Sequence, residues 1–342
     1  MSQIIEKYIE AHPSIYHKAH NERKIKIACA IPNDGENCET GILFLLPGYG
    51  GNIESNVYRH IREDFSDAYN LIVVQCEYFG SSFMQESVPE IAENLSKNEY
   101  IEEMNIKLKT VLEENVQDFN DMGLMQALDI VATTLYVLEN IKIVNTNRII
   151  IFGNSHGAYL AHLANIICPQ LFSYIIDISG YIIPYYLDRT RVLGYVFGDN
   201  KVIDVLYRYM ITERKSIRYN KNLYNLSYLY NKINNHCHIL AIQGTEDWMV
   251  DYTEKRDFIK SIPYGDIMMV TKQDVDGVIF KDANHGCGLD YIKFLEMVIP
   301  IFDKKISVCN YLIIDNVVCI GDKLQISYEA NRPKVEYISF EE

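Results

Sequence analysis

The sequence predicts an α/β fold in which helices flank a mostly parallel central sheet. Short, β-rich apolar runs alternate along the chain with longer stretches of helical period, which is the order of elements that builds such a sheet. The short runs carry apolar residues at consecutive positions, as parallel strands must when helices cover both of their faces. With 342 residues, 48% of them hydrophobic, the chain can bury a large core.

The individual elements follow from these periodicities. We expect strands at 24–31, 41–46, 70–76, 148–152, 174–178, 238–243 and 277–281. The first of them is expected at an edge of the sheet. We expect helices at 99–115, 122–141, 252–262 and 287–299.

Three segments depart from the simple alternation. Residues 85–121 hold ten acidic residues against three lysines, which predicts a solvated helical excursion. Residues 181–235 hold ten of the 26 tyrosines and nine Lys or Arg against four Asp or Glu, and we expect a helical cap there. Alternating strands after Pro300 predict a small β appendage. We therefore divide the chain into an α/β domain over 1–300, which contains the cap, and a β extension over 301–342.

Charge and cysteine usage limit the classes of partner. Lys plus Arg number 32 against 46 Asp plus Glu, a net charge of -14, and such a chain repels the phosphate backbone of a nucleic acid. The first residues lack the apolar run of a signal peptide, and no run approaches the ~18 residues of a membrane-spanning helix. The eight cysteines form no C-x-x-C pair. We expect a cytoplasmic protein with reduced thiols, no nucleic-acid partner and no membrane partner; no pattern indicates its oligomeric state.

The most informative passage is G-x-S-x-G at 153–157, between an apolar strand and a helix-forming run. The two glycines let the chain turn sharply enough to hold Ser155 exposed, in a strained conformation, at the carboxyl end of the strand. This context predicts a nucleophile elbow. The alternative is a glycine-rich turn with an idle serine, and the flanking strand and helix disfavour it.

A nucleophilic serine needs a base, and the base needs an orienting carboxylate. Asp247 lies on the loop after the strand at 238–243, where catalytic groups of parallel sheets collect. Its rivals are Glu246 and Asp177. Among the nine histidines only His285 follows Asp247, so the chain order serine, acid, histidine leaves one candidate for the base.

The oxyanion of acyl transfer must be met by preorganised donors. The backbone N–H of His156 supplies one, and its side chain is expected to point away from the nucleophile. The second donor is expected in the loop Pro-Gly-Tyr-Gly-Gly at 47–51, with Tyr49 as first choice and Gly50 as second. A phosphate cradle is the alternative for this loop, but the sequence has neither G-x-G-x-x-G nor G-K-[ST] there.

These motifs together resemble the α/β-hydrolase superfamily, in the style of its esterase and prolyl-oligopeptidase-like branches. The resemblance runs from about residue 40 to 300 and rests on P-G-Y-G-G (47–51), G-N-S-H-G-A-Y (153–159), G-T-E-D-W-M-V (244–250) and N-H-G (284–286). It implies Ser155 as nucleophile, Asp247 as acid, His285 as base, and Tyr49 with His156 as the oxyanion pair. The chain is also similar to an uncharacterised hydrolase-like family of flagellated bacteria whose genes lie among flagellin-glycosylation functions.

The expected activity is hydrolysis of an acyl ester or amide through an acyl-enzyme, with no metal and no organic cofactor. Because the segment at 181–235 carries five net positive charges, we expect a small anionic acylated substrate, such as an acidic sugar with an O-acetyl or N-acyl group. Gly50, Arg189, Arg191 and Arg208 are the expected substrate-binding residues. Alternatively, these cations pair with the acidic segment at 85–121. A peptidase, a thioesterase and a non-catalytic binding protein remain the alternative functions.

Overall fold

A central sheet of eight strands organises the part of the chain that the structure describes. The computed structural model describes residues 2–16, 22–81, 84, 108–114, 119–141, 144–197, 201–209, 221–303, 318–320, 324–329 and 332–337. The strand order of the central sheet is β1-β2-β4-β3-β6-β7-β10-β11. These strands are β1 (Gln3–Glu10), β2 (Lys24–Ile31), β3 (Gly41–Leu46), β4 (Leu71–Cys76), β6 (Ile149–Asn154), β7 (Tyr174–Ile178), β10 (His238–Gly244) and β11 (Gly265–Val270).

The sheet is mostly parallel. The pairs β1–β2 and β2–β4 are antiparallel, and every pair from β4 to β11 is parallel. Because parallel strands end at the same edge, the loops after β3, β6, β7 and β10 meet at one side of the sheet. All the motifs singled out in the sequence lie in or near these loops.

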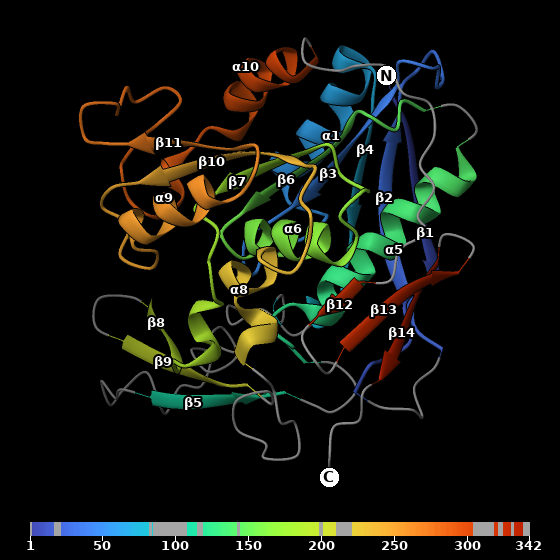
Figure 1. Ribbon diagram of the computed structural model, residues 1–342. Helices are drawn as coiled ribbons and strands as arrows, with labels where there is room; N and C mark the ends of the chain where they lie inside the picture. The colour runs from blue at the N-terminus through green and yellow to red at the C-terminus, as the bar shows by residue number, and fades with distance from the viewer. Residues whose placement is uncertain are drawn as a thin grey trace.

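Two helical layers cover the sheet, as Figure 1 shows. Successive side chains of a strand point to opposite faces, so Ile42 and Phe44 of β3 join one apolar cluster while Leu43 and Leu45 join the other. The first cluster includes α5 (Leu124–Asn140), α6 (His156–Ile167), α8 (Leu226–Tyr230) and α9 (Tyr252–Ser261). The second includes α1 (Asn56–Tyr69) and α10 (Tyr291–Asp303). The predicted architecture, the α/β-hydrolase fold, is confirmed.

Some predicted elements are wrong. The expected strand at 277–281 is irregular, and the last core strand is β11, which pairs with β10. The expected edge strand at 24–31 is covered by β1, whose register runs from Gln3 opposite Ile31. Within the helix expected at 99–115, strand β5 (Leu108–Glu113) is observed instead. Of the acidic segment at 85–121, the structure describes 108–114 and 119–121, and the rest lies outside the described residues.

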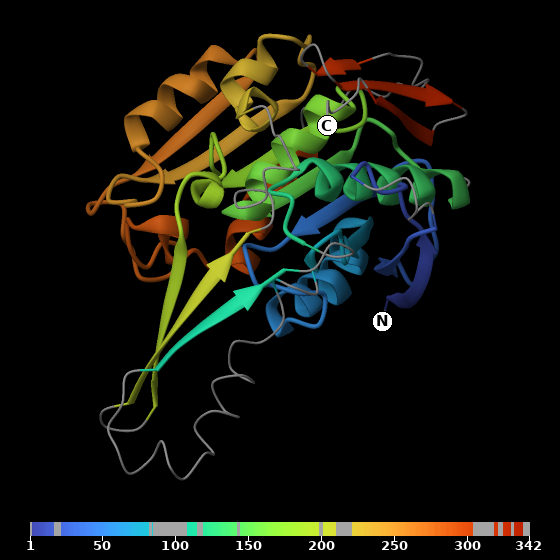
Figure 2. The ribbon, with the colours of Figure 1, turned by 90° about the horizontal axis from the view of Figure 1, so that it is seen from below.

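The insert at 181–235 also differs from the helical cap that we expected. It contains β8 (Arg191–Phe197) and β9 (Lys201–Arg208), an antiparallel pair to which β5 adds in parallel. Figure 2 shows these three strands projecting away from the central sheet. Within the described part of the insert, helical turns are confined to η1 (Tyr185–Leu187), η2 (Lys221–Tyr224) and α8. The many β-branched and aromatic residues of β8 and β9 favour strands over helices.

The C-terminal strands form a sheet of their own. Its order is β12 (Val318–Ile320), β13 (Leu324–Glu329) and β14 (Arg332–Tyr337), with antiparallel pairing throughout. This agrees with the predicted β appendage. Among the helices that the structure describes, none combines the length and the apolar character needed to cross a bilayer.

Candidate active site

Ser155 sits in a sharp turn between β6 and α6. Its φ of 52° lies in the left-handed region, which side chains rarely adopt, so the turn is strained as expected of an elbow. The flanking glycines are required by close approach. A Cβ on Gly153 would lie 2.5 Å from the backbone of Ala158, and one on Gly157 would lie 2.3 Å from the carbonyl oxygen of Leu46. The turn therefore holds the serine against the end of β3.

Ser155, His285 and Asp247 converge at this edge of the sheet. The Ser155 Oγ lies 2.7 Å from the His285 Nε2, and the His285 Nδ1 lies 2.8 Å from the Asp247 Oδ2. The Asp247 carboxylate is fully buried, while the His285 ring is partly accessible. In the tautomer with a proton on Nδ1, His285 donates to Asp247 and accepts the proton of Ser155, which is the arrangement of a nucleophile with its base and orienting acid.

The Asp247 carboxylate is anchored on several sides. Its Oδ1 accepts the backbone N–H of Met249 (2.8 Å) and Val250 (3.1 Å), and its Oδ2 also accepts the side-chain amide of Gln243 (2.8 Å). Burial alone would raise the pKa of Asp247, but the hydrogen bond and charge of His285 and the Gln243 and Met249 donors hold it below its usual value. The acid therefore stays ionised beside the imidazole.

The rival acids have other partners. The Glu246 carboxylate pairs with Lys272 (2.6 Å) on the surface. Asp177 is fully buried, accepts from His162 (2.8 Å) and Lys255 (2.5 Å), and does not reach His285.

The loops that carry the acid and the base are joined through the backbone. The Glu246 N–H donates to the Ala283 carbonyl (2.9 Å), and a Cβ on Gly244 would lie 2.2 Å from that same oxygen. On the other side, the Gly286 N–H donates to the Ser179 Oγ (2.9 Å). Backbone contacts on both sides of His285 therefore fix its position over Ser155.

The two predicted oxyanion donors, Tyr49 and His156, lie on segments that adjoin Ser155. The loop at 47–51 packs on the elbow, where a Cβ on Gly48 would lie 3.6 Å from the Ser155 Cβ. Neither Tyr49 nor His156 uses its backbone N–H in a hydrogen bond within the described residues. Gly50 has a φ of +83° in a turn closed by the Gly51 N–H and the Gly48 carbonyl (3.0 Å). The positive φ that this turn requires is sufficient to explain why residue 50 is a glycine.

The His156 side chain points away from the nucleophile. Its Nε2 lies 2.8 Å from the Gln126 Oε1, and its ring is buried between Tyr49 and Tyr159. Burial, with a smaller effect of the Arg191 charge, lowers the pKa of His156 to about 3. The imidazole is therefore neutral and serves packing, while the backbone of the residue faces the site.

Tyr181 is a member of the site that the sequence reasoning missed. Its hydroxyl lies 3.1 Å from the Ser155 Oγ, and its ring lies nearly parallel to that of His285, with centroids 5.9 Å apart. Burial raises the pKa of Tyr181 to about 12 despite the hydrogen bond to Ser155, which lowers it. The hydroxyl of Tyr181 is therefore protonated. It accepts the Ser155 proton in the structure, and it can donate in turn when Ser155 shares that proton with His285. The position of Tyr181 shortly after a strand end was the available signal, as it was for Ser179.

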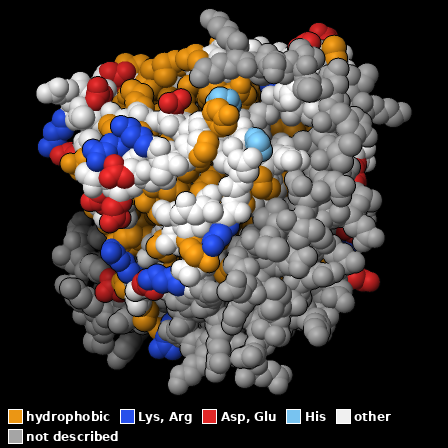
Figure 3. All heavy atoms as spheres, viewed as in Figure 1, with side chains coloured by type: hydrophobic (Ala, Val, Ile, Leu, Met, Phe, Trp, Pro, Cys, Tyr) orange, Lys and Arg blue, Asp and Glu red, His pale blue; other side chains and the backbone are white. Residues whose placement is uncertain are grey.

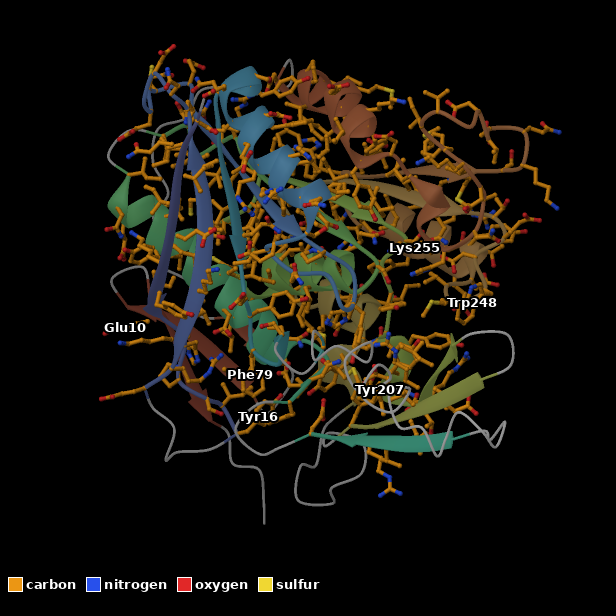
Figure 4. The ribbon with its side chains drawn as sticks, turned by 180° about the vertical axis from the view of Figure 1, so that it is seen from behind. Glu10, Tyr16, Phe79, Tyr207, Trp248 and Lys255 are labelled. Atoms are coloured by element: carbon orange, nitrogen blue, oxygen red, sulfur yellow. The ribbon has the colours of Figure 1, made fainter. Side chains whose placement is uncertain are left out.

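Aromatic side chains surround the mouth of the site. Tyr185 stacks on Tyr181 (6.4 Å), meets Tyr186 edge to face (5.1 Å), and meets the ring of Trp248 edge to face (5.8 Å). Trp248 follows the acid in sequence and is 68% exposed. Figure 4 labels Trp248 beside the core and Tyr207 at the small sheet. A row of planar rings therefore leads from Ser155 outward to the exposed Trp248.

The three arginines expected at the substrate differ in their surroundings. Arg189 is exposed and lies over the Tyr185 ring (4.3 Å). Arg208 is exposed at the end of β9. Arg191 lies among tyrosine rings, 3.5 Å from the centroid of Tyr49. On the face in Figure 3, basic and acidic side chains are interspersed around α9 and the β8–β9 region.

A family of proteins of unknown function, DUF2920, matches residues 81–320, well over half of the chain. The chain belongs to DUF2920. The match includes Ser155, Asp247, His285 and the insert, whereas the loop at 47–51 precedes it. No curated protein matches the DUF2920 chain.

Solved structures similar to the DUF2920 chain have the α/β-hydrolase fold. A candidate dipeptidyl aminopeptidase IV from Bacteroides ovatus has a TM-score of 0.55 at 15% identity; the match covers 90% of this chain and 36% of that one. An acylaminoacyl peptidase from Pyrococcus horikoshii has a TM-score of 0.54 at 12% identity, covering 91% and 43%. The chain thus spans well under half the length of these two. Est1E from Butyrivibrio proteoclasticus has a TM-score of 0.49 at 14% identity, covering 82% and 94%. At these identities the first two likenesses show the fold of the DUF2920 chain, which is the α/β-hydrolase fold.

Proposed function

We propose that this DUF2920 chain is a serine hydrolase that cleaves a carboxylic ester or amide through an acyl-enzyme. The observation that carries the proposal is the relay from Ser155 to His285 (2.7 Å) and from His285 to Asp247 (2.8 Å). Hydrolysis needs a nucleophile within reach of a base that is itself oriented by a carboxylate, and these two distances meet that requirement.

The proposed reaction has two halves. The Ser155 Oγ forms a bond to the acyl carbon while His285 Nε2 takes the serine proton, and the leaving group departs with that proton as its bond to the acyl carbon breaks. Water, deprotonated by His285, then attacks the acyl-enzyme; the acid is released and Ser155 regains its proton. Asp247 stays ionised throughout, in keeping with its lowered pKa, and balances the imidazolium that forms in each half.

Two backbone donors support an oxyanion intermediate, because the N–H groups of Tyr49 and His156 have no competing acceptor within the described residues. Each preorganised donor of an oxyanion hole contributes about 2.7–4 kcal/mol to the barrier reduction. The hydroxyl of Tyr181 acts instead on the Ser155 Oγ, which it reaches directly. We infer an esterase or deacylase acting on a small acylated molecule, because planar rings rather than a long aliphatic channel line the mouth.

A fluorophosphonate probe tests the nucleophile directly. We expect the wild-type protein to be labelled covalently, and the Ser155→Ala variant to lose the label. Ser261→Ala is the matched control, because that hydroxyl only caps α9 by donating to the Phe258 carbonyl, and it should label like the wild type. A wild-type protein that folds but takes no label, and hydrolyses no member of a panel of acetyl, butyryl and aminoacyl esters, would contradict the proposal and favour a binding protein.

The acid is tested by an isosteric change. Asp247→Asn keeps the shape of the side chain but offers His285 an amide, which favours the wrong tautomer. We expect kcat for an activated ester to fall about 10³–10⁴-fold with a small change in KM. Glu246→Gln is the control, since that side chain pairs with Lys272, and it should keep kcat within about twofold of the wild type.

A further inference from the structure

Arg191 occupies an unusual position for a cation. It is the first residue of β8, and its guanidinium lies 3.5 Å from the ring centroid of Tyr49, 4.9 Å from that of Tyr207 and 5.2 Å from that of Tyr186. Tyr207 is its register partner across the β8–β9 pair. The rings attract the cation through their faces and cover much of it.

The nitrogens of Arg191 are incompletely bonded. The Nε and Nη1 atoms are buried and have no hydrogen-bond partner, and no carboxylate in the described residues forms an ion pair with this guanidinium. Ring faces satisfy a guanidinium above and below its plane, but its N–H groups point outward in the plane and still need acceptors. Buried polar groups are rarely left unbonded, so two such nitrogens in one cation point to an acceptor that arrives from outside.

The guanidinium belongs to the surroundings of the nucleophile. Tyr49, whose ring it contacts, carries one of the proposed oxyanion donors and meets the His156 ring edge to face (6.3 Å). On the other side, Tyr186 leads through Tyr185 to Tyr181, which touches Ser155. One ring on the Tyr49 side and three rings on the Tyr181 side therefore connect Arg191 with the surroundings of Ser155.

We propose that Arg191 binds a carboxylate of the substrate, so that the substrate is an acyl compound carrying a carboxylate a few atoms from the scissile carbonyl. The proposal rests on the proposed hydrolase function. A carboxylate suits the site because its single negative charge matches the single guanidinium, and a carboxylate oxygen can accept an N–H group that lacks a partner.

Arg189 and Arg208, the other two arginines expected at the substrate, fit this role less well. Both side chains are exposed, and the Arg189 guanidinium lies over one ring only. Water screens an exposed cation, so its attraction for an anion is weak, whereas three tyrosine rings cover the Arg191 guanidinium. Arg189→Gln and Arg208→Gln should therefore change the KM for an anionic substrate less than Arg191→Gln does.

Binding without turnover provides the first test. In the Ser155→Ala background, calorimetry measures the affinity for succinate, glutarate and adipate and for their neutral dimethyl esters. We expect at least one dicarboxylate to bind while its diester does not, and Arg191→Gln to weaken that binding about 10–100-fold. Arg256→Gln, on the exposed face of α9, is the matched control and should leave the affinity unchanged. Arg191→Lys, which keeps the positive charge but loses the planar set of N–H donors of the guanidinium, should retain part of the affinity.

Turnover provides the second test. The wild type should hydrolyse the nitrophenyl hemiester of the preferred dicarboxylate with a kcat/KM at least tenfold above that of nitrophenyl acetate, and Arg191→Gln should remove this preference by raising the KM for the hemiester. Equal affinities in the Ser155→Ala background with and without Arg191, or no binding of any dicarboxylate, would overturn the assignment. Arg191-dependent binding without fluorophosphonate labelling would instead support this site and refute the hydrolase.

Discussion

At Ser155, two side chains meet around one oxygen. His285 approaches at 2.7 Å and the Tyr181 hydroxyl at 3.1 Å. The serine has a single proton, so when that proton is shared with His285 the tyrosine is left to donate. A donor at the Oγ stabilises negative charge on this oxygen as the proton leaves, and the stacked tyrosine ring also limits the rotation of the imidazole.

Tyr181→Phe separates the hydroxyl from the ring. We expect kcat for an activated ester to fall about tenfold, because the donor is lost, while KM and the unfolding free energy stay close to their wild-type values. Steady-state kinetics with urea unfolding measure both quantities. Tyr185→Phe is the comparison variant, since the Tyr185 ring contacts the Tyr181 ring but makes no hydrogen bond to Ser155 within the described residues. Equal kcat values in the wild type and Tyr181→Phe would mean that the hydroxyl only fills space.

At the scale of elements, a buried polar cluster joins β7, α6 and α9 beneath the site. The Lys255 ammonium donates to Asp177 (2.5 Å) and to the carbonyl of Gly180 (2.7 Å), while Asp177 also binds His162 (2.8 Å). Burial alone would raise the pKa of Asp177, but the Lys255 charge and the His162 contacts hold it well below its usual range. Because Gly180 immediately precedes Tyr181, this cluster positions the tyrosine.

Lys255→Met tests that cluster. Removing the ammonium leaves the Asp177 carboxylate buried without its counter-charge, and we expect a loss of about 3–5 kcal/mol in unfolding free energy. The double variant Asp177→Asn with Lys255→Met removes both charges and should recover much of that loss. Urea unfolding at neutral pH measures all three proteins. A double variant less stable than Lys255→Met would contradict a charge-based explanation.

The elbow also depends on contacts between elements. In Gly157→Ala the new methyl group would meet the carbonyl oxygens of Leu46 (2.3 Å) and Pro47 (2.5 Å), so β3 and α6 must separate. We expect a loss of about 2–3 kcal/mol and fluorophosphonate labelling at least tenfold slower. Gly194→Ala in β8 is the control, because its nearest described atom is 3.5 Å away, and its stability should stay within about 0.5 kcal/mol of the wild type.

At the scale of the whole molecule, the sequence predicted the order of the chain's functional parts better than the limits of its elements. Apolar runs identified β3, β4, β6, β7 and β10, and the ends of three of them carry the motifs. The loops then follow from the topology, because parallel strands present their carboxyl ends at one edge. This is why Ser155, Asp247 and His285 could be chosen from sequence.

Other features depend on tertiary contacts that periodicity does not report. Strand β11 alternates between exposed and partly buried residues, so its apolar pattern is weaker than that of the run at 277–281. Strand β1 is mostly exposed, so it has no apolar run to identify it. Strand β9 of the insert pairs with β5, whose residues lie more than seventy positions earlier in the sequence, and no local pattern encodes that pairing. Tyr181 was one among many tyrosines, and Arg191 was one of three arginines expected at the substrate, until the fold placed them beside Ser155 and Tyr49.

Acid should destabilise the whole fold through its buried imidazoles. Burial lowers the pKa of His156 to about 3 and also lowers that of His162, whereas in the unfolded chain both titrate near ~6.5. Below that pH the unfolded state binds protons that the folded state does not, so stability is lost as the pH falls. Each such group contributes about 1.4 kcal/mol per pH unit, down to its folded pKa.

His156→Gln isolates one of these contributions. Between pH 6 and pH 5 we expect the wild type to lose about 1.4 kcal/mol more unfolding free energy than the variant, whatever the variant's stability at pH 7. Urea unfolding at several pH values measures the two slopes. Parallel curves would mean that the imidazole at position 156 is not buried in its neutral form.

The placement of Trp248 gives the molecule an optical reporter of its own. It is the only tryptophan in the chain, it follows Asp247 directly, and it meets the Tyr185 ring at the mouth of the site while remaining 68% exposed. Its fluorescence emission therefore comes from a single known location. Any compound that enters between these rings displaces water from the indole, so stopped-flow changes in emission can follow its arrival and departure without an attached dye.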